Sequence, residues 1–145
     1  DDVIEFIENA RKEFKSLPPE EIAFPRTASN VQKYKSSSDI YVKGTPIHIR
    51  GALLFNYYLR KKKLTNKYSA IGNGEKIKFL YLKKPNTIQE NVLSFIKDFP
   101  TEFGLSQYID YELQFEKSFV YPLKAILDAI GWEVEKKVTL ESFFS

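Results

Sequence analysis

Residues 45–60 read Thr-Pro-Ile-His-Ile-Arg-Gly-Ala-Leu-Leu-Phe-Asn-Tyr-Tyr-Leu-Arg and carry a strong helix signal. The hydroxyl of Thr45 can cap a helix, and Pro46 suits the first helical position because its missing N–H would be unbonded there anyway. A helical period then continues to about Arg60 through Ile49, Ala52, Leu53, Asn56 and Tyr57, of which only Asn56 is strongly polar. A helix from Pro46 to Arg60 is therefore predicted.

Toward the N-terminus, residues 1–17 predict an amphipathic helix that Pro18-Pro19 ends. Its apolar face consists of Val3, Phe6, Ile7, Ala10 and Phe14. Residues 20–26 read as a short linker or strand, and Ser29 is expected to cap a short helix that reaches Tyr34.

Toward the C-terminus, Gly72-Asn73-Gly74 predicts a turn, followed by an alternating strand over Lys76–Leu82. Residues 92–96 predict a second strand paired with it. A helical pattern then runs from Ser106 to about Ile130, with Pro122 expected to kink it and Gly131 to end it. Its apolar face is formed by Tyr108, Tyr111, Phe115, Phe119, Leu123, Ile126, Leu127 and Ile130.

These elements predict an α+β fold that is mainly helical, with a small antiparallel sheet and a long, kinked C-terminal helix. The kinked helix is expected to pack with the 1–17 and 46–60 helices. A chain of 145 residues fits one globular domain. Since it starts at Asp1 and contains no Met, it is expected to be part of a longer protein.

Positive charge is concentrated in one tract. Between Arg26 and Lys67, ten basic residues face one acid, Asp39, which gives +9; the whole chain carries +3, so the remainder carries −6. A basic tract between acidic flanks is typical of a protein that binds a polyanion. On charge alone, a solvated basic face without a ligand is an equally good interpretation.

Several site classes are excluded or unsupported. With no Cys and a single His, the chain has neither a disulfide framework nor a thiolate or multi-histidine metal site. The lack of Cys use makes a reducing, intracellular location the default, and no membrane span or signal peptide is expected. We find no phosphate-binding Gly-rich loop, and Asp110 and Glu112 are spaced to point to different faces of a helix.

Several stretches together resemble family B DNA polymerases of the T-even-phage type. The segment 45–52 is similar to their Pro-x-His-Ile-Arg-Gly helix start, residues 28–34 to an Asn-x-x-Lys-Tyr segment, and residues 74–81 to a Gly-Glu-Lys strand. Residues 108–132 look like the closing helix of the thumb, and residues 140–144 form an aromatic C-terminal end. The order and spacing over nearly the whole chain carry the resemblance. One departure is Tyr121, where the T-even-type helix has a Lys before its Pro-Leu, although Lys124 is close.

The resemblance implies that residues 1–136 are the polymerase thumb and residues 137–145 a clamp-binding tail. A thumb grips the primer–template duplex through phosphates and sugars, without reading sequence. The DNA-binding residues implied are Ser29, Asn30, Lys33, Tyr34, Lys43, Thr45, His48, Arg50, Lys117 and Lys124. For His48 alone, a surface or capping role is the alternative.

The tail has its own predicted role. Lys137, Leu140, Phe143 and Phe144 match the spacing of the clamp-interacting box Gln-x-x-Leu-x-x-Phe-Phe, with Lys137 in place of Gln. We expect Leu140, Phe143 and Phe144 to bind the sliding clamp. A C-terminus packed into the core of its own domain is the alternative.

The parent enzyme implied is a DNA-directed DNA polymerase in the cytoplasm of the infected bacterial host. Its other parts, the palm, fingers and exonuclease, are expected partners, and its Mg²⁺ is expected on palm carboxylates. This chain alone should hold no cofactor, have no catalytic residues and be inactive. Two alternatives stay open: a separately encoded DNA-binding subunit or replication accessory protein, and an interaction domain whose basic tract is incidental.

Overall fold

The computed structural model describes residues 2–131, which form two compact units. Unit 1 consists of residues 2–17 and 111–131, and unit 2 consists of residues 18–110. The sequence predicted one globular domain, whereas the structure gives each unit an apolar core of its own. The predicted boundary between residues 136 and 137 lies outside the described residues.

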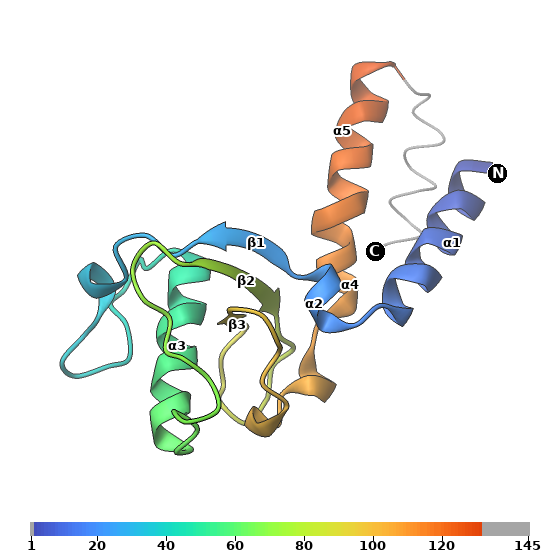
Figure 1. The fold of residues 1–145 in the computed structure, drawn as a ribbon. Coiled ribbons are helices and arrows are strands. Elements are labelled where there is room, and N and C mark those ends of the chain that lie inside the picture. Colours follow the sequence, from blue (N-terminus) through green and yellow to red (C-terminus); the bar gives the residue numbers. More distant parts are fainter. Residues whose placement is uncertain (1, 132–145) are drawn as a thin grey trace. The chain divides into compact units, whose positions relative to one another are not determined.

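A three-stranded antiparallel sheet forms the centre of unit 2 (Figure 1). Its strands are β1 (Phe24–Thr27), β2 (Lys76–Tyr81) and β3 (Val92–Phe95), in the order β1-β2-β3. The register pairs Phe24 with Phe79 and Phe79 with Ser94. The predicted strands at 76–82 and 92–96 and their pairing are confirmed. The segment 20–26, predicted as a linker or strand, contributes only its last three residues to the third strand, because residues 19–22 are helical.

Helix α3 (Ile47–Lys61) packs along β3. Its buried side includes Ile49, Leu54 and Phe55, each at most 2% exposed. Gly51 allows this approach, since a Cβ at residue 51 would lie 2.4 Å from Ser94 Oγ and 2.7 Å from Ser94 N. The predicted 46–60 helix is therefore confirmed, and its apolar face covers the sheet of unit 2. Its predicted packing against the C-terminal helix stays a prediction, because the structure defines each unit separately.

Unit 1 contains α1 (Asp2–Ser16) and a continuous helical stretch made of α4 (Tyr111–Phe115), η4 (Glu116–Val120) and α5 (Tyr121–Ala129). Ile7 of α1 is fully buried, and the same core contains Phe115, Val120 and Leu127. Phe14 contacts Phe115 edge-on, with ring centroids 5.4 Å apart. The predicted packing of the 1–17 helix with the C-terminal helix is confirmed.

The helix changes type just before Pro122, and the predicted kink at Pro122 stays a prediction. The turn before it, η4, is π-helical, and Ser118 Oγ bonds to the backbone oxygen of Gln114 within it. A proline cannot donate the regular helical hydrogen bond, and a wider turn directly before it accommodates that loss. Three apolar residues predicted on core faces are exposed instead: Phe6, Ile126 and Ile130 are 60%, 59% and 71% exposed.

The predicted start of the C-terminal helix at Ser106 is wrong. Residues Ser106–Tyr108 form a short 3-10 helix, η3, and Ile109 then pairs with Leu82 in an isolated bridge. The backbone N–H of Asp110 donates to Tyr81 O at 2.9 Å. Pairing with the end of β2 thus replaces helical hydrogen bonds, and helix α4 begins only at Tyr111.

The remaining short elements are α2 (Pro19–Ile22), η1 (Val31–Tyr34) and η2 (Thr101–Phe103). Pro18-Pro19 does end the first helix as predicted, and Pro19 then opens α2. Within residues 2–131, no helix has the length and apolar character needed to cross a membrane.

Candidate nucleic-acid interface

The start of α3 carries two of the predicted contact residues, His48 and Arg50. Pro46 lies at the N-cap position, and its carbonyl accepts the N–H of Ile49 at 3.0 Å and of Arg50 at 2.8 Å. The Thr45 hydroxyl donates to Val42 O at 2.6 Å. The predicted capping of α3 by Thr45 is therefore wrong: Pro46 occupies the N-cap position one residue later, and no side-chain hydrogen bond caps the helix.

The short helix η1 carries Lys33 and Tyr34. Its N-cap is Asn30, with a left-handed φ of 58°, so the predicted cap at Ser29 is displaced by one residue. The N–H of Asn30 donates to the side-chain oxygen of Asn73 at 2.5 Å, which ties η1 to the predicted 72–74 turn. Ser29, Asn30 and Lys33 are exposed, and Lys33 Nζ lies 5.4 Å from the centre of the Tyr34 ring.

The loop 35–45 joins these two elements into one continuous piece of unit 2. Lys35 pairs with Tyr41 in an isolated bridge, and the N–H of Val42 donates to Tyr34 O at 3.0 Å. Lys43, between this bridge and α3, is exposed. The structure thus brings together eight of the ten predicted DNA-binding residues on η1, the 35–45 loop and the start of α3.

Arg50 is engaged inside unit 2. Its guanidinium donates to Asn91 Oδ1 at 2.8 Å and forms an ion pair with Glu90 Oε1 at 3.4 Å. It also lies 5.7 Å from the centre of the Tyr41 ring, whose hydroxyl donates to both Glu90 oxygens. Arg50 therefore holds the 82–91 segment and Tyr41 against the start of α3, which sequence reasoning did not detect.

His48 is half-buried beside β1 and β2. Its ring centre lies 6.5 Å from that of Phe79. Burial and the neighbouring Arg26 charge lower the pKa of His48 below its ordinary value, while a hydrogen bond to the Thr27 backbone acts in the opposite direction. At neutral pH His48 is therefore uncharged and can offer a ligand a hydrogen bond rather than a positive charge.

Lys117 and Lys124, the other two predicted contacts, belong to unit 1. Lys117 is exposed in η4, and Lys124 is half-buried in α5. Unit 1 therefore carries two of the predicted DNA-binding cations, apart from the eight predicted contacts of unit 2. The predicted clamp-binding residues Leu140, Phe143 and Phe144 lie outside the described residues.

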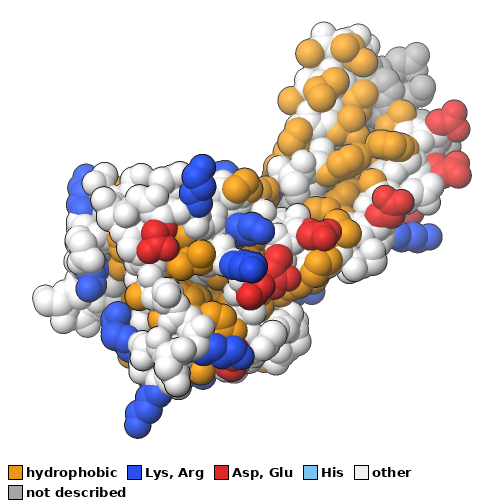
Figure 2. All heavy atoms as spheres, in the orientation of Figure 1, with side chains coloured by type: hydrophobic (Ala, Val, Ile, Leu, Met, Phe, Trp, Pro, Cys, Tyr) orange, Lys and Arg blue, Asp and Glu red, His pale blue; other side chains and the backbone are white. Residues whose placement is uncertain are grey.

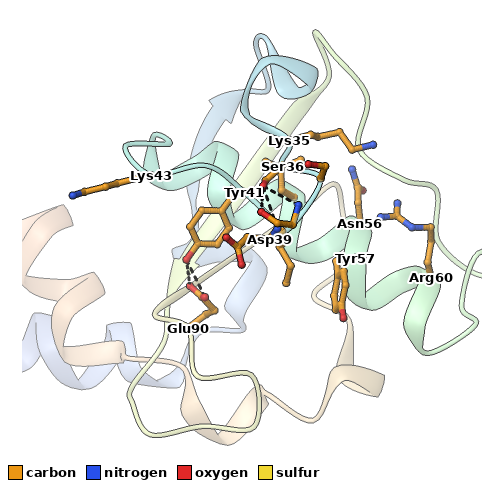
Figure 3. Close-up of a pocket in the computed structure, with 13 residues that line it drawn as sticks. Lys35, Ser36, Asp39, Tyr41, Lys43, Asn56, Tyr57, Arg60 and Glu90 are labelled. Carbon is orange, nitrogen blue, oxygen red and sulfur yellow. Dashed lines mark hydrogen bonds between the residues drawn. The ribbon is translucent and has the colours of Figure 1, made fainter.

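An open pocket of about 760 Å³ lies in unit 2, between the 35–43 loop and α3 (Figure 3). It is lined by Lys35, Ser36, Ser37, Ser38, Asp39, Ile40, Tyr41, Lys43, Leu53, Asn56, Tyr57, Arg60 and Glu90. Of these, the sequence singled out only Lys43 as a contact. Lys35 and Arg60 belong to the basic tract, which is the only feature of the sequence that could have predicted a role for them in binding.

The charged groups of unit 2 are spread over its surface. On the face shown in Figure 2, Lys and Arg side chains are scattered over unit 2 rather than gathered in one dense patch. Such a distribution suits a ligand that presents repeated charges more than one that presents a single anion. Within residues 2–131, no group of three or more His, Asp or Glu side chains is arranged to hold a metal ion.

Two known proteins match this chain along most of its length. It is 29% identical over 146 residues to the DNA-directed DNA polymerase of Enterobacteria phage T4, which covers 98% of this chain. It is 30% identical over 140 residues to the DNA-directed DNA polymerase of Escherichia phage RB69, which covers 90% of it. The chain resembles a segment of a T4-like phage DNA polymerase. The T-even-type resemblance predicted from the sequence is thereby confirmed.

This chain spans only a small part of those T4-like polymerases, 16% of the T4 enzyme and 14% of the RB69 enzyme. No protein-family model matches it.

Proposed function

We propose that this chain is the thumb of a T4-like family B DNA polymerase and that it grips the primer–template duplex by its phosphate backbone. The observation that carries the proposal is that eight predicted contact residues of the basic tract lie on η1, the 35–45 loop and the start of α3 in unit 2. The chain that contains them is similar to phage DNA polymerases. Phosphate contacts supply affinity for any sequence, as replication requires.

Residues just before η1, within η1 and in the following loop are proposed as the direct contacts; all are exposed except Tyr34, which is half-buried. Lys33 and Lys43 supply positive charge, and Ser29, Asn30 and Tyr34 supply polar groups that can bond to phosphate oxygens. Lys117 and Lys124 of unit 1 provide a second set.

Thr45, His48 and Arg50 are proposed to act at the same surface with more restricted roles. Thr45 and Arg50 already have partners within unit 2, at Val42, Glu90 and Asn91. A phosphate that binds Thr45 or Arg50 must therefore either replace one of these hydrogen bonds or bind in addition to it. The neutral His48 is proposed to act as a hydrogen-bonding group.

Salt-dependent DNA binding tests this proposal. Duplex DNA of mixed sequence is titrated with the chain at several salt concentrations, and the logarithm of the affinity is plotted against the logarithm of salt. Each phosphate neutralised contributes a slope of about −0.9. We expect Lys33→Ala to lower affinity and to make the slope shallower by about 0.9 if one phosphate contact is lost.

Lys12→Ala is the matched control for this experiment. Lys12 is an exposed lysine of α1, outside the proposed contact set, and its loss removes the same charge. We expect its affinity and slope to stay near those of the unsubstituted chain. A flat salt response, strong preference for one sequence, or equal effects of the two substitutions would contradict the proposal.

We further propose that the parent protein carries out nucleotidyl transfer, with Mg²⁺ held by carboxylates of its palm, in the cytoplasm of an infected bacterial cell. Its palm, fingers and exonuclease would be the partners of this chain. The chain alone is expected to incorporate no nucleotide with or without Mg²⁺. Incorporation by a highly purified sample would contradict the assignment as a thumb.

The C-terminal residues 137–145 are proposed to tether the polymerase to its sliding clamp. Leu140, Phe143 and Phe144 are spaced as in a clamp-binding peptide, and burying each would contribute about 1.5–3 kcal/mol before the cost of ordering the peptide. A peptide of residues 136–145 is titrated against the clamp of the same replication system, beside a Phe143→Ala/Phe144→Ala peptide. Equal binding of both peptides, or no binding of either, would mean that the tail serves another purpose.

A further inference from the structure

The pocket between the 35–43 loop and α3 has a size and a lining that gripping a duplex does not require. Its volume of about 760 Å³ falls within the roughly 300–1,000 Å³ typical of small-molecule sites. Duplex phosphates are contacted by exposed side chains and need no concave site. The pocket therefore calls for a ligand group that can enter it.

The charge of the pocket favours an anion. Lys35, Lys43 and Arg60 bring three positive charges, against Asp39 and Glu90. Glu90 is already paired with the guanidinium of Arg50 and accepts the Tyr41 hydroxyl at 2.8 and 2.9 Å, so its charge is largely satisfied within the protein.

The wall of the pocket also offers a flat aromatic surface. Tyr57 lines the pocket, and its ring is nearly perpendicular to that of Tyr58, with centroids 4.9 Å apart and an angle of 83° between planes. Lys61 Nζ lies 5.8 Å from the centre of the Tyr57 ring. Leu53 adds a buried apolar group to the lining. An aromatic face beside cations is the combination by which proteins hold a base and its phosphate.

The pocket is built from fixed parts. The Ser36 hydroxyl accepts the N–H of Ser38 at 3.3 Å and of Asp39 at 3.1 Å, which organises the loop from within. On the opposite wall, the amide of Asn56 exchanges two hydrogen bonds with the backbone of Ile71, at 3.0 and 2.7 Å. A preformed site loses little conformational freedom when a ligand binds.

The position of the cations indicates where a phosphate would lie. Figure 3 shows Lys35, Asn56 and Arg60 at one end of the pocket with Tyr57 nearby, while Lys43 extends from the other end. Because the Asn56 amide is bonded to Ile71, Lys35 and Arg60 are the groups at that end suited to bind an anion.

We propose that this pocket holds one nucleotide of an unpaired DNA strand, with its base against Tyr57 and its phosphate beside Lys35 and Arg60. The inference rests on the proposed DNA-binding function and adds to it a second mode, in which single-stranded DNA is bound in a pocket that shares only Lys43 with the proposed duplex contacts. Stacking on an aromatic side chain tolerates every base, so no sequence preference is expected.

Binding of a fluorescent oligothymidylate, followed by anisotropy, tests the proposal. Removing a stacked aromatic costs about 1–3 kcal/mol per base, so Tyr57→Ala is expected to weaken binding about tenfold. Tyr57→Leu keeps apolar volume but not the aromatic face, and it should weaken binding similarly while preserving the fold. Arg60→Ala should weaken binding severalfold.

Lys62→Ala is the matched control for Arg60→Ala. Lys62 is an exposed cation two residues further on, and it does not line the pocket. A strand of the same length without bases separates base stacking from backbone attraction. If the Tyr57 and Arg60 variants bind oligothymidylate as well as Lys62→Ala does, or if the baseless strand binds as tightly as oligothymidylate, the proposal is overturned.

Duplex binding separates the failure of this proposal from that of the proposed function. We expect the Tyr57 variants to keep duplex affinity and its salt dependence. Unchanged oligothymidylate binding in these variants, with duplex binding intact, would overturn the pocket alone. Loss of the predicted salt response for duplex DNA, with pocket-dependent binding of oligothymidylate intact, would overturn the duplex grip alone.

Discussion

Replacing Gly51 by alanine is expected to destabilise unit 2, because α3 crosses β3 too closely there for a side chain. A Cβ at residue 51 would lie 2.4 Å from Ser94 Oγ, 2.7 Å from Ser94 N and 3.1 Å from the carbonyl carbon of Leu93. Overpacking of this kind costs about 1–3 kcal/mol. The cost should lie near 3 kcal/mol, since two of the three obstructing atoms are backbone and cannot rotate away.

Helix propensity acts in the opposite direction, because alanine favours a helix over glycine by about 1 kcal/mol. The net loss is therefore about 2 kcal/mol in the free energy of unfolding. At about 4 °C per kcal/mol for a chain of this size, the melting temperature should fall by about 8 °C. Thermal and urea unfolding followed by circular dichroism measure both quantities.

Gly72→Ala is the matched control, since the nearest neighbour of a Cβ there is the flexible carboxylate end of Glu75, at 3.1 Å. Its stability should stay within about 1 kcal/mol of the unsubstituted chain. Ser94→Ala alone loses a hydrogen bond to His48 O at 2.8 Å, worth about 1 kcal/mol. Combined with it, Gly51→Ala should cost less than in the unsubstituted chain, because one obstructing atom is gone. A Gly51→Ala variant as stable as the unsubstituted chain would refute the close approach of α3 to β3.

Three further outcomes are expected. The hydrogen bonds from Lys67 and Tyr68 lower the pKa of Glu102 from 4.5 to about 2. The contribution of Glu102 to stability should therefore be complete above about pH 4.5 and lost as the pH falls toward 2. Between these pH values, the melting temperature of Glu102→Gln should depend less on pH than that of the unsubstituted chain. Proton NMR should give His48 a titration midpoint below 6.5 that rises in Arg26→Ala, and no change on removing Arg26 would contradict the assigned cause. Arg50→Ala should lower the free energy of unfolding by about 1–2 kcal/mol, and Arg50→Lys should restore only part of it, because an ammonium lacks the planar fork that reaches two acceptors.

Elements with a local signal could be predicted from the sequence. The 46–60 helix has a proline start and a largely apolar face, and the strand at 76–82 alternates polar and apolar residues from Lys76 to Phe79 after a glycine turn. Both signals arise from neighbours within a few residues and survive folding unchanged. The contribution of α1 to the core of unit 1 could be predicted in the same way, since Ile7 and Phe14 recur on one side of that helix.

Features that depend on distant partners could not be predicted. The helical spacing of apolar residues extends back to Tyr108, yet the backbone of residues 108–110 bonds to the end of β2 instead. The cap predicted at Thr45 failed because Pro46 occupies the N-cap position, and the Thr45 hydroxyl donates back to Val42 O at 2.6 Å. In both cases the conformation of the surrounding backbone decided the outcome, and that conformation follows only from the fold.

The same distinction governs how much positive charge the basic tract offers to DNA. The sequence gives a net +9 between Arg26 and Lys67, counted as if every cation faced solvent. In the structure Glu90 pairs with Arg50 and Glu102 pairs with Lys67, and both acids come from outside the tract. The charge left for a ligand is therefore smaller than the sequence suggests. It resides in exposed residues of η1, the following loop and the end of α3, so the proposed duplex and single-strand sites draw on adjacent parts of one limited supply.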